Sequence, residues 1–254
     1  MIPKIIHYCW LSGDPFPENI QRCIDTWKEY LPDYEFMLWD RQRFPQGQSL
    51  WVDQAFRSKR YAFAADFIRL YALYNYGGIY LDCDVEVLRT FNPFLHLRNM
   101  ICWQKDCEGL EVATFGVEPH AAWVKQCLDY YDGRPFVTEK GFYDDLTMPL
   151  ITERQLRAAD YSLVDVATID EAQAVEGDKT IAVLPSDFFS PKSYRTKETR
   201  LTANTVSIHQ FEGSWLFIPF YTKIDLFLGR LFHCRFFYLT TALRYVRLLL
   251  FRHQ

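Results

Sequence analysis

Residues 65–84 have the sequence ADFIRLYALYNYGGIYLDCD. The part before Gly77 lacks proline and glycine and is largely apolar, and the same character extends upstream, so we expect one long buried helix over residues 51–76. Gly77 and Gly78 end this helix, as a left-handed C-cap would. Residues 79–84 then have the pattern of a strand that begins apolar and finishes acidic.

The segments upstream have the order strand, helix, strand. β-Branched and aromatic residues favour a strand over residues 2–10, apolar residues recur at helical spacing over 18–30, and residues 34–39 alternate like a second strand. Such a β-α-β opening is usual in α/β nucleotide-binding domains. Because ligands bind beyond the carboxyl ends of strands in open α/β sheets, the acidic end of residues 79–84 is the expected site.

The segments downstream carry weaker patterns. The expected elements are a continuation of the acidic strand over 85–88, strands at 100–103 and 113–117, helices at 121–131 and 148–159, and a strand that runs into a polar loop at 206–215. We find no internal repeat and no low-complexity linker. The length of 254 residues therefore suits a single catalytic domain, which we place at residues 1–223.

The composition excludes several classes of protein. Hydrophobic residues make up 49% of the chain and aromatic residues 17%, which excludes a disordered protein, and the net charge of -4 gives no general attraction to nucleic acid. The seven cysteines are odd in number and form no CxxC pair, so we expect free thiols in a reducing compartment. The N-terminus lacks the apolar run of a signal peptide.

Asp82 and Asp84 are the candidate catalytic residues. Two carboxylates at positions i and i+2 of a strand point to the same face, where they can share one divalent cation with a diphosphate. The motif alone is weak, because it arises by chance about once in a chain of this length. Asp66 and Arg69 strengthen it, since residues three apart share one face of a helix. An ion pair on a solvated surface is the alternative, but their apolar neighbours argue against it.

Three separate motifs carry a resemblance to a known family. Residues 65–84, the opening segment IPKIIHYCW (2–10) and the segment HQFEGSW (209–215) resemble, in this order, the DXD sugar-binding glycosyltransferases. That family includes capsular polysaccharide and lipopolysaccharide transferases and yeast outer-chain mannosyltransferases, and the clostridial glucosylating toxins are distant relatives. The resemblance implies a GT-A type fold, a Rossmann-like mixed sheet flanked by helices.

The resemblance also implies an activity. It predicts Mn2+- or Mg2+-dependent transfer of a hexose, with retention, from a nucleotide-diphosphate sugar to a glycan acceptor in capsule, O-antigen or other surface polysaccharide synthesis. We expect a UDP-hexose donor, and GDP-mannose stays open. The implied donor-binding residues are Trp10 on the base, Asp66 and Arg69 on donor hydroxyls, and Gly78, Tyr80, Asp82, Ser214 and Trp215. The implied metal ligands are Asp82, Asp84 and His209, whereas the spacing of Glu212 puts its role in doubt.

Each of these residues also has a plain structural interpretation. Trp10 could be an ordinary core aromatic, and His209 could be a histidine with satisfied hydrogen bonds. His7 is expected to be structural because it lies at the buried start of its strand. Glu108 and Glu111 could face the sugar, but a solvated loop is the expectation. No residue is predicted to act as a catalytic nucleophile, and a front-face transfer needs none.

Two other functions remain open from the sequence. A metal-dependent phosphohydrolase also uses clustered aspartates, but it normally carries a further Asp or His cluster that we do not find. An inactive, membrane-associated assembly protein could keep the same fold, although the retained motifs argue against decay. A donor-hydrolysis assay separates these possibilities.

The last part of the chain, residues 224–254, has an apolar stripe at helical spacing. From Lys223 onward there are six basic residues and one acid, Asp225, and the longest uncharged stretch is far shorter than the roughly 20 residues that span a bilayer. We expect an amphipathic helical tail that lies on the cytoplasmic face of the membrane, near a lipid-linked acceptor. Packing of the stripe on the catalytic domain, or in a homodimer, is the alternative.

Overall fold

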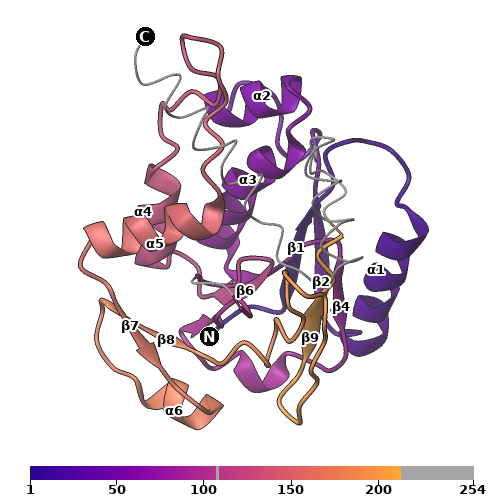
Figure 1. Cartoon of the computed structure of the whole chain (residues 1–254), viewed down its shortest axis with the longest axis vertical. Helices are drawn as coiled ribbons and strands as arrows, with labels where there is room; N and C mark the ends of the chain where they lie inside the picture. The colour runs from indigo at the N-terminus through magenta and orange to yellow at the C-terminus, as the bar shows by residue number, and fades with distance from the viewer. Residues whose placement is uncertain (107–108, 213–254) are drawn as a thin grey trace, which may run out of the picture. The chain divides into compact units, whose positions relative to one another are not determined.

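A five-stranded mixed sheet forms the centre of the protein (Figure 1), in a computed structural model that describes residues 1–106 and 109–212. Its strands, in the order β2-β1-β3-β6-β5, are β2 (Glu35–Trp39), β1 (Ile5–Cys9), β3 (Gly78–Leu81), β6 (Thr114–Val117) and β5 (Asn99–Met100). β1 is parallel to both β2 and β3, whereas β6 is antiparallel to β3 and to β5. The carboxyl ends of β1 and β3 therefore lie at the same edge.

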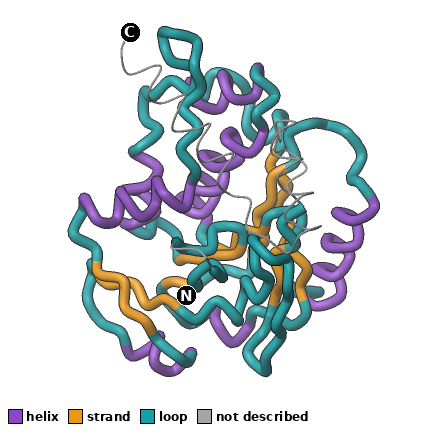
Figure 2. Tube along the Cα trace, in the orientation of Figure 1, coloured by secondary structure: helices purple, strands orange, loops and turns teal. Residues whose placement is uncertain are grey.

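Helices cover both faces of this sheet (Figure 2). One face carries α2 (Leu50–Arg57), α3 (Tyr61–Tyr76), α4 (Ala122–Asp129) and α5 (Met148–Ala158), and the other carries α1 (Glu18–Tyr30). β3 is buried along its whole length, and its side chains alternate between the two cores. Tyr80 packs with the α2–α5 helices, whereas Ile79 and Leu81 pack on the α1 side.

Two small sheets complete the described fold. β4 (Val85–Val87) pairs antiparallel with β9 (Ser207–His209), a strand more than a hundred residues later in the chain. β7 (Ser162–Asp165) and β8 (Thr180–Val183) are parallel and are joined through α6 (Ile169–Ala174). A single 3-10 turn, η1, covers Asn92–Phe94. The β7-α6-β8 unit was not predicted from the sequence, because both strands are only four residues long and β7 is largely exposed.

The expected helix over residues 51–76 is wrong in one respect, because the chain breaks between α2 and α3. Lys59 has a φ of 54°. The amide of Arg60 donates to the carbonyl of Ala55 (2.8 Å) and the amide of Lys59 donates to that of Phe56 (2.9 Å). This is a Schellman motif. Its left-handed position usually holds glycine, and a lysine there gives no sign of the break in the sequence.

Several other expectations about the fold are confirmed. The mixed sheet flanked by helices that a GT-A type fold predicts is confirmed, and α1 has the predicted bounds. Gly77 ends α3 with a φ of 64°, although its ψ of -162° lies outside the left-handed helical region. Five cysteines are free thiols in the described part of the chain: Cys9, Cys23, Cys83, Cys102 and Cys127. The domain boundary at 223/224 and the tail at 224–254 lie outside the described residues.

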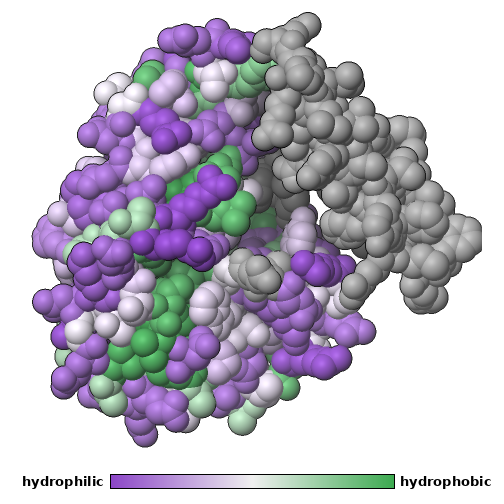
Figure 3. Space-filling view, turned by 60° about the vertical axis from the view of Figure 1, so that its left-hand side comes forward, coloured by the Kyte–Doolittle hydropathy of each residue, from purple (hydrophilic) through white to green (hydrophobic). Residues whose placement is uncertain are grey.

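No helix among the described residues has both the length and the apolar character needed to cross a bilayer. The face drawn in Figure 3 is mostly hydrophilic, with separate hydrophobic areas rather than one continuous surface.

Candidate active site

Asp82 and Asp84 lie in a turn rather than on one strand. The amide of Val85 donates to the carbonyl of Asp82 (2.9 Å), which closes a turn between β3 and β4. The expected continuation of β3 over residues 85–88 is therefore wrong, because this segment pairs with β9 in another sheet. The amide of Asp82 is still held by the sheet, since it donates to the carbonyl of Ala113 (2.9 Å).

Arg69 joins the helix to this turn. Its Nη2 lies 3.1 Å from Oδ1 of Asp66 and 3.2 Å from Oδ1 of Asp82, and its Nη1 donates to the carbonyl of Val112 (2.8 Å). Tyr80 donates its hydroxyl to the same Oδ1 of Asp82 (3.0 Å), and the guanidinium lies over its ring. The Arg69 side chain is 5% exposed, so the solvated-surface alternative for this pair is wrong.

Burial and charge act in opposite directions in this part of the site. Burial raises the pKa of Asp66 to about 6, although Arg69 lowers it. Burial also lowers the pKa of Arg69, but Asp82, Tyr80 and Asp66 outweigh it, so the pKa of the guanidinium stays above its usual value. A permanently charged arginine therefore sits between two carboxylates.

Asp84 faces β9. Nε2 of His209 lies 3.5 Å from its Oδ1, and the amide of Glu212 donates to its Oδ2 (2.9 Å). The amide of Gln210 donates to its backbone carbonyl (3.0 Å), and Val85 is paired with His209 in the β4–β9 ladder. Burial raises the pKa of Asp84, and His209 opposes this shift. Glu212 thus contributes its backbone N–H to the site, while its side chain is exposed.

Glu111 belongs to the site, although the sequence favoured a solvated loop for it over a place facing the sugar. Its side chain is 2% exposed, so the solvated loop expected for it is wrong. Nδ1 of His209 lies 3.4 Å from its carboxylate, and the amide of Ala113 donates to its Oε1 (2.8 Å). Burial lowers the pKa of His209, but Glu111 and Asp84 raise it to about 9. An acid within the apolar run of residues 110–113 was the available signal.

The pKa of Glu111 follows from the same contact. Burial raises it, but His209, helped by Ser190 and the amide of Ala113, holds the pKa of this carboxyl below its usual value. The carboxylate form of Glu111 is therefore the form present at neutral pH.

Three of these side chains suit a divalent cation. One ligand atom each from Asp82, Asp84 and His209 lies within 4.8 Å of the others. Two ligands of one ion, each about 2.1 to 2.4 Å from it, lie at most about 4 to 5 Å apart. Two carboxylate oxygens and an imidazole nitrogen form a donor set that Mn2+ accepts. The residues present thus fit the expected metal.

Trp10 follows β1 at the same edge of the sheet. Its indole N–H donates to the carbonyl of Asp14 (2.6 Å), and its ring centroid lies 4.8 Å from that of Phe16. The side chain is only partly buried, in contrast to a core tryptophan such as Trp27. A partly exposed ring at this edge of the sheet can present a face to a ligand.

Gly78 and His7 lie deeper in the sheet than the carboxylates. Gly78 begins β3 with a φ of 98°, and a Cβ there would lie 2.6 Å from the carbonyl oxygen of Ile5. Nε2 of His7 donates to the carbonyl of Gly77 (2.8 Å), and its Nδ1 accepts from the indole N–H of Trp39 (3.1 Å). The structure does not bring Gly78 to the cluster, and His7 has the structural position expected of it.

Some predicted residues lie outside the described part of the chain. These are Ser214 and Trp215 of the donor-binding set, and Glu108.

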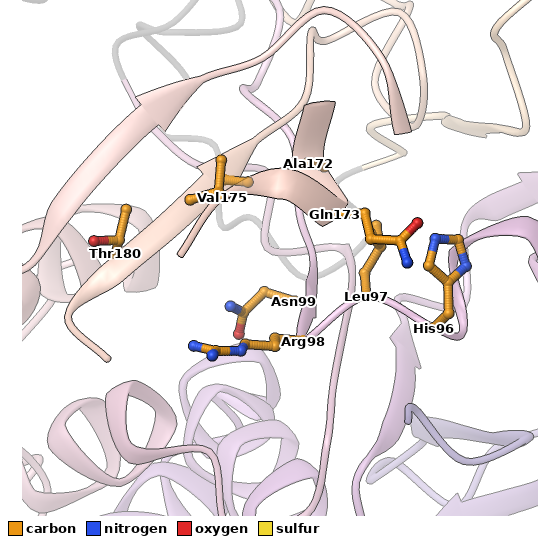
Figure 4. Close-up of a pocket in the computed structure, with 9 residues that line it drawn as sticks. His96, Leu97, Arg98, Asn99, Ala172, Gln173, Val175 and Thr180 are labelled. Atoms are coloured by element: carbon orange, nitrogen blue, oxygen red, sulfur yellow. The ribbon is translucent and has the colours of Figure 1, made fainter. Parts of the chain in front are cut away.

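A separate pocket opens elsewhere on the molecule (Figure 4). It has a volume of about 190 Å³ and lies between the segment before β5 and the α6–β8 unit. His96, Arg98, Asn99 and Gln173 supply polar groups to it. None of the residues predicted for the site lines it.

The fold and the cluster define an α/β protein with a carboxylate-rich cluster, able to hold a cation, at the edge where β1 and β3 end. Residues 17–104 match the glycosyltransferase sugar-binding region containing the DXD motif. The resemblance found in the sequence is thus confirmed for this segment of the chain. The match contains Asp66, Arg69, Asp82 and Asp84, whereas Glu111 and His209 lie beyond it.

Several of the relatives are fungal proteins named for mannosyl transfer. Inositol phosphoceramide mannosyltransferase 3 of Schizosaccharomyces pombe is 40% identical over 103 residues, which cover 37% of this chain and 28% of the relative. Mannosyl phosphorylinositol ceramide synthase CSH1 of Saccharomyces cerevisiae is 38% identical, with 37% and 26% covered. The match thus spans about a quarter of the length of each relative. The solved PaToxG glycosyltransferase is 20% identical, with a TM-score of 0.47 and with 63% of this chain and 70% of that chain covered.

Proposed function

We propose that this protein is a metal-dependent glycosyltransferase that moves a hexose from a nucleotide-diphosphate sugar to a glycan acceptor. One observation carries the proposal: Asp82, Asp84 and His209 converge on a possible cation site directly beside the buried Asp66–Arg69 pair. The segment that holds four of these five residues matches a sugar-binding region of glycosyltransferases. A phosphohydrolase has no comparable support.

The residues of the site would have different roles in the transfer. A cation held by Asp82, Asp84 and His209 would supply positive charge to the diphosphate that leaves with the nucleoside. Asp66 would accept hydrogen bonds from hydroxyls of the donor sugar, while Arg69 fixes the orientation of both aspartates. Tyr80 is buried and bonded to Asp82, so it positions that carboxylate rather than touching the donor. Transfer with retention is part of the proposal, tested by the anomeric form of the product.

The names of the relatives favour a mannosyl donor over the UDP-hexose expected from the sequence. GDP-mannose is therefore the first donor to test. These relatives are named after inositol phosphoceramide, so an acceptor sugar or inositol carried on a lipid is proposed in preference to capsule or O-antigen.

A panel of nucleotide sugars tests the proposal. The protein is incubated with each donor and Mn2+, with and without simple acceptors, and release of nucleoside diphosphate is measured. We expect release with one donor, stimulated by acceptor and lost in a chelator. Release of inorganic phosphate from a simple phosphate ester would favour the phosphohydrolase, and no release with any donor would favour the inactive protein.

Trp10 tests the donor side of the site. Trp10→Ala should weaken donor binding by about 1 to 3 kcal/mol if its ring stacks on the base. Trp10→Phe keeps a stacking face and should recover most of this loss. A lowered melting temperature with normal donor binding would instead show that Trp10 is a packing residue.

The location of the protein is also a proposal. We propose that residues 224–254 hold it at the cytoplasmic face of a membrane, because the segment combines an apolar stripe with excess positive charge. Sedimentation with anionic and with neutral liposomes tests this. Binding that is equal for both kinds of liposome, or absent, contradicts the proposal.

A further inference from the structure

Glu111 is a buried carboxylate that needs a partner. Leaving an ionised carboxylate in a protein interior without one costs several kcal/mol. Among the described residues, the one basic side chain within ion-pair distance of it is His209, at 3.4 Å. The amide of Ala113 fixes the carboxylate from the other side (2.8 Å). The buried charge of Glu111 is therefore balanced by the imidazole of His209.

The segment that carries Glu111 is tied to the rest of the site. The amide of Glu111 donates to the carbonyl of Cys102 (2.9 Å). The next two carbonyls, those of Val112 and Ala113, accept from Arg69 and from the amide of Asp82. The position of the Glu111 carboxylate is thus fixed relative to the same residues that hold the first aspartate of the motif.

The two nitrogens of His209 face different partners. Nδ1 faces Glu111, and Nε2 faces Oδ1 of Asp84 at 3.5 Å. The ring of Phe211 lies against the imidazole, with ring centroids 3.9 Å apart. A metal binds a ring nitrogen that carries no proton. An imidazole that keeps its proton on Nδ1 therefore presents the lone pair of Nε2 to the metal.

We propose that Glu111 is a positioning residue that holds the Nδ1 proton of His209 and thereby aims Nε2 at the cation site formed with Asp82 and Asp84. This proposal rests on the metal site of the proposed function, and it adds a residue that lies outside the matched family segment. A carboxylate behind a metal-binding histidine raises the basicity of the ligand and fixes its orientation.

Mn2+ binding without any sugar donor tests the proposal. Glu111→Gln can still accept from the amide of Ala113, but it turns an N–H toward Nδ1 and favours the wrong form of the imidazole. We expect the Kd for Mn2+, measured by electron paramagnetic resonance, to rise about 10- to 100-fold. Glu86→Gln is the matched control, because the Glu86 carboxylate accepts from Gln210, just after the neighbouring strand, and the change should leave the Kd unchanged.

A double-mutant cycle shows whether Glu111 acts through His209. His209→Ala should weaken Mn2+ binding, and adding Glu111→Gln should then weaken it no further. An unchanged Kd in Glu111→Gln, or an equal loss with and without His209, overturns the positioning role while leaving the proposed function intact. If the unaltered protein binds no Mn2+, both this proposal and the metal site fail, and transfer in a chelator decides whether the activity survives.

A measurement on the unaltered protein covers the case in which Glu111→Gln does not fold. Imidazole 15N NMR with Zn2+ as a diamagnetic stand-in should show His209 with a proton on Nδ1 and the metal on Nε2. The metal on Nδ1, or His209 unaffected by saturating Zn2+, overturns the proposal.

Discussion

The two halves of the candidate site are built in different ways. The local half, Asp66, Arg69 and Asp82, comes from the single α3–β3 unit, and its ion pairs join residues of one short segment. The distant half, Asp84, Glu111 and His209, needs β9 to pair with β4, and its histidine contact joins residues 98 positions apart. Local geometry therefore places the first half, and the complete fold places the second.

The halves also differ in how their charge is balanced. Arg69 neutralises the local half permanently, because its pKa lies above its usual value. In the distant half, among the described residues, a single histidine faces two carboxylates. Four carboxylates thus share one arginine and one histidine, and the site is short of positive charge where Asp82, Asp84 and His209 meet. This difference predicts that Arg69 of the local half stabilises the protein, whereas the distant half supplies two of the three cation ligands, Asp84 and His209.

Asp84→Asn tests the distant half and should have the largest effect on activity. Loss of one group that stabilises developing charge lowers kcat by about 10²- to 10³-fold, and loss of the cation adds to this, so we expect transfer to become undetectable. The melting temperature in a chelator should change little, because an amide removes one charge from an acidic cluster. Asp187→Asn, which alters a loop aspartate bonded to Thr202, is the control and should keep full activity. Unchanged turnover of Asp84→Asn with Mn2+ contradicts the metal assignment.

Arg69→Met tests the local half through stability. It leaves two carboxylates without their shared guanidinium, and breaking a buried ion pair from one side costs about 3 to 5 kcal/mol. We expect this loss in the free energy of unfolding measured with urea. Arg157→Met removes the exposed pair with Glu153 and should cost less than about 1 kcal/mol. If Asp84→Asn destabilises the protein as much as Arg69→Met does, the two halves do not differ as proposed.

His7 lies between the end of α3 and β2, where it contacts Gly77 and Trp39, and its contribution to stability depends on pH. Burial lowers the pKa of His7 to about 4, whereas the unfolded chain has a value of about 6.5. The unfolded chain therefore binds more protons between these values, and stability is lost as the pH falls from about 6.5 to about 4. The loss amounts to roughly 3 kcal/mol, since each pKa unit corresponds to about 1.4 kcal/mol.

His7→Gln isolates this effect, because glutamine can still donate to the carbonyl of Gly77 but does not titrate. The raised pKa of Asp66 works with the opposite sign, because it favours the folded state at low pH. Comparing urea unfolding of the two proteins from pH 7 to pH 4 cancels this contribution. The stability difference should shift by roughly 3 kcal/mol in favour of His7→Gln toward low pH. A difference that is independent of pH contradicts the neutral, buried state of His7.

The contrast between the halves also explains what the sequence could predict. Periodicity predicts α1, β1 and β2, and helix spacing places Asp66 and Arg69 together, because these patterns are local. The apolar run of residues 110–113 could have indicated that Glu111 is buried, but no local pattern reports its partner His209, which lies 98 positions along the chain. The turn at Asp82 escaped for the same reason, since residues 85–87 pair with the distant strand β9, and the alternation of side chains does not tell which strands pair. Roles for the metal and donor residues stay predictions.

The smallest effect concerns the turn that lets α3 begin where it does. Lys59 has a φ of 54°, a conformation that costs a residue with a Cβ about 1 to 2 kcal/mol. Lys59→Gly relieves this strain, but glycine also raises the conformational entropy of the unfolded chain, which offsets part of the stabilisation. We therefore expect a net stabilisation of up to about 1 kcal/mol. Lys125→Gly in the interior of α4 is the matched control and should destabilise by about 1 kcal/mol. Urea unfolding gives the two signs. Destabilisation by Lys59→Gly would favour one continuous helix over residues 51–76, in which α3 and the Asp66–Arg69 pair would be fixed by helix propensity alone.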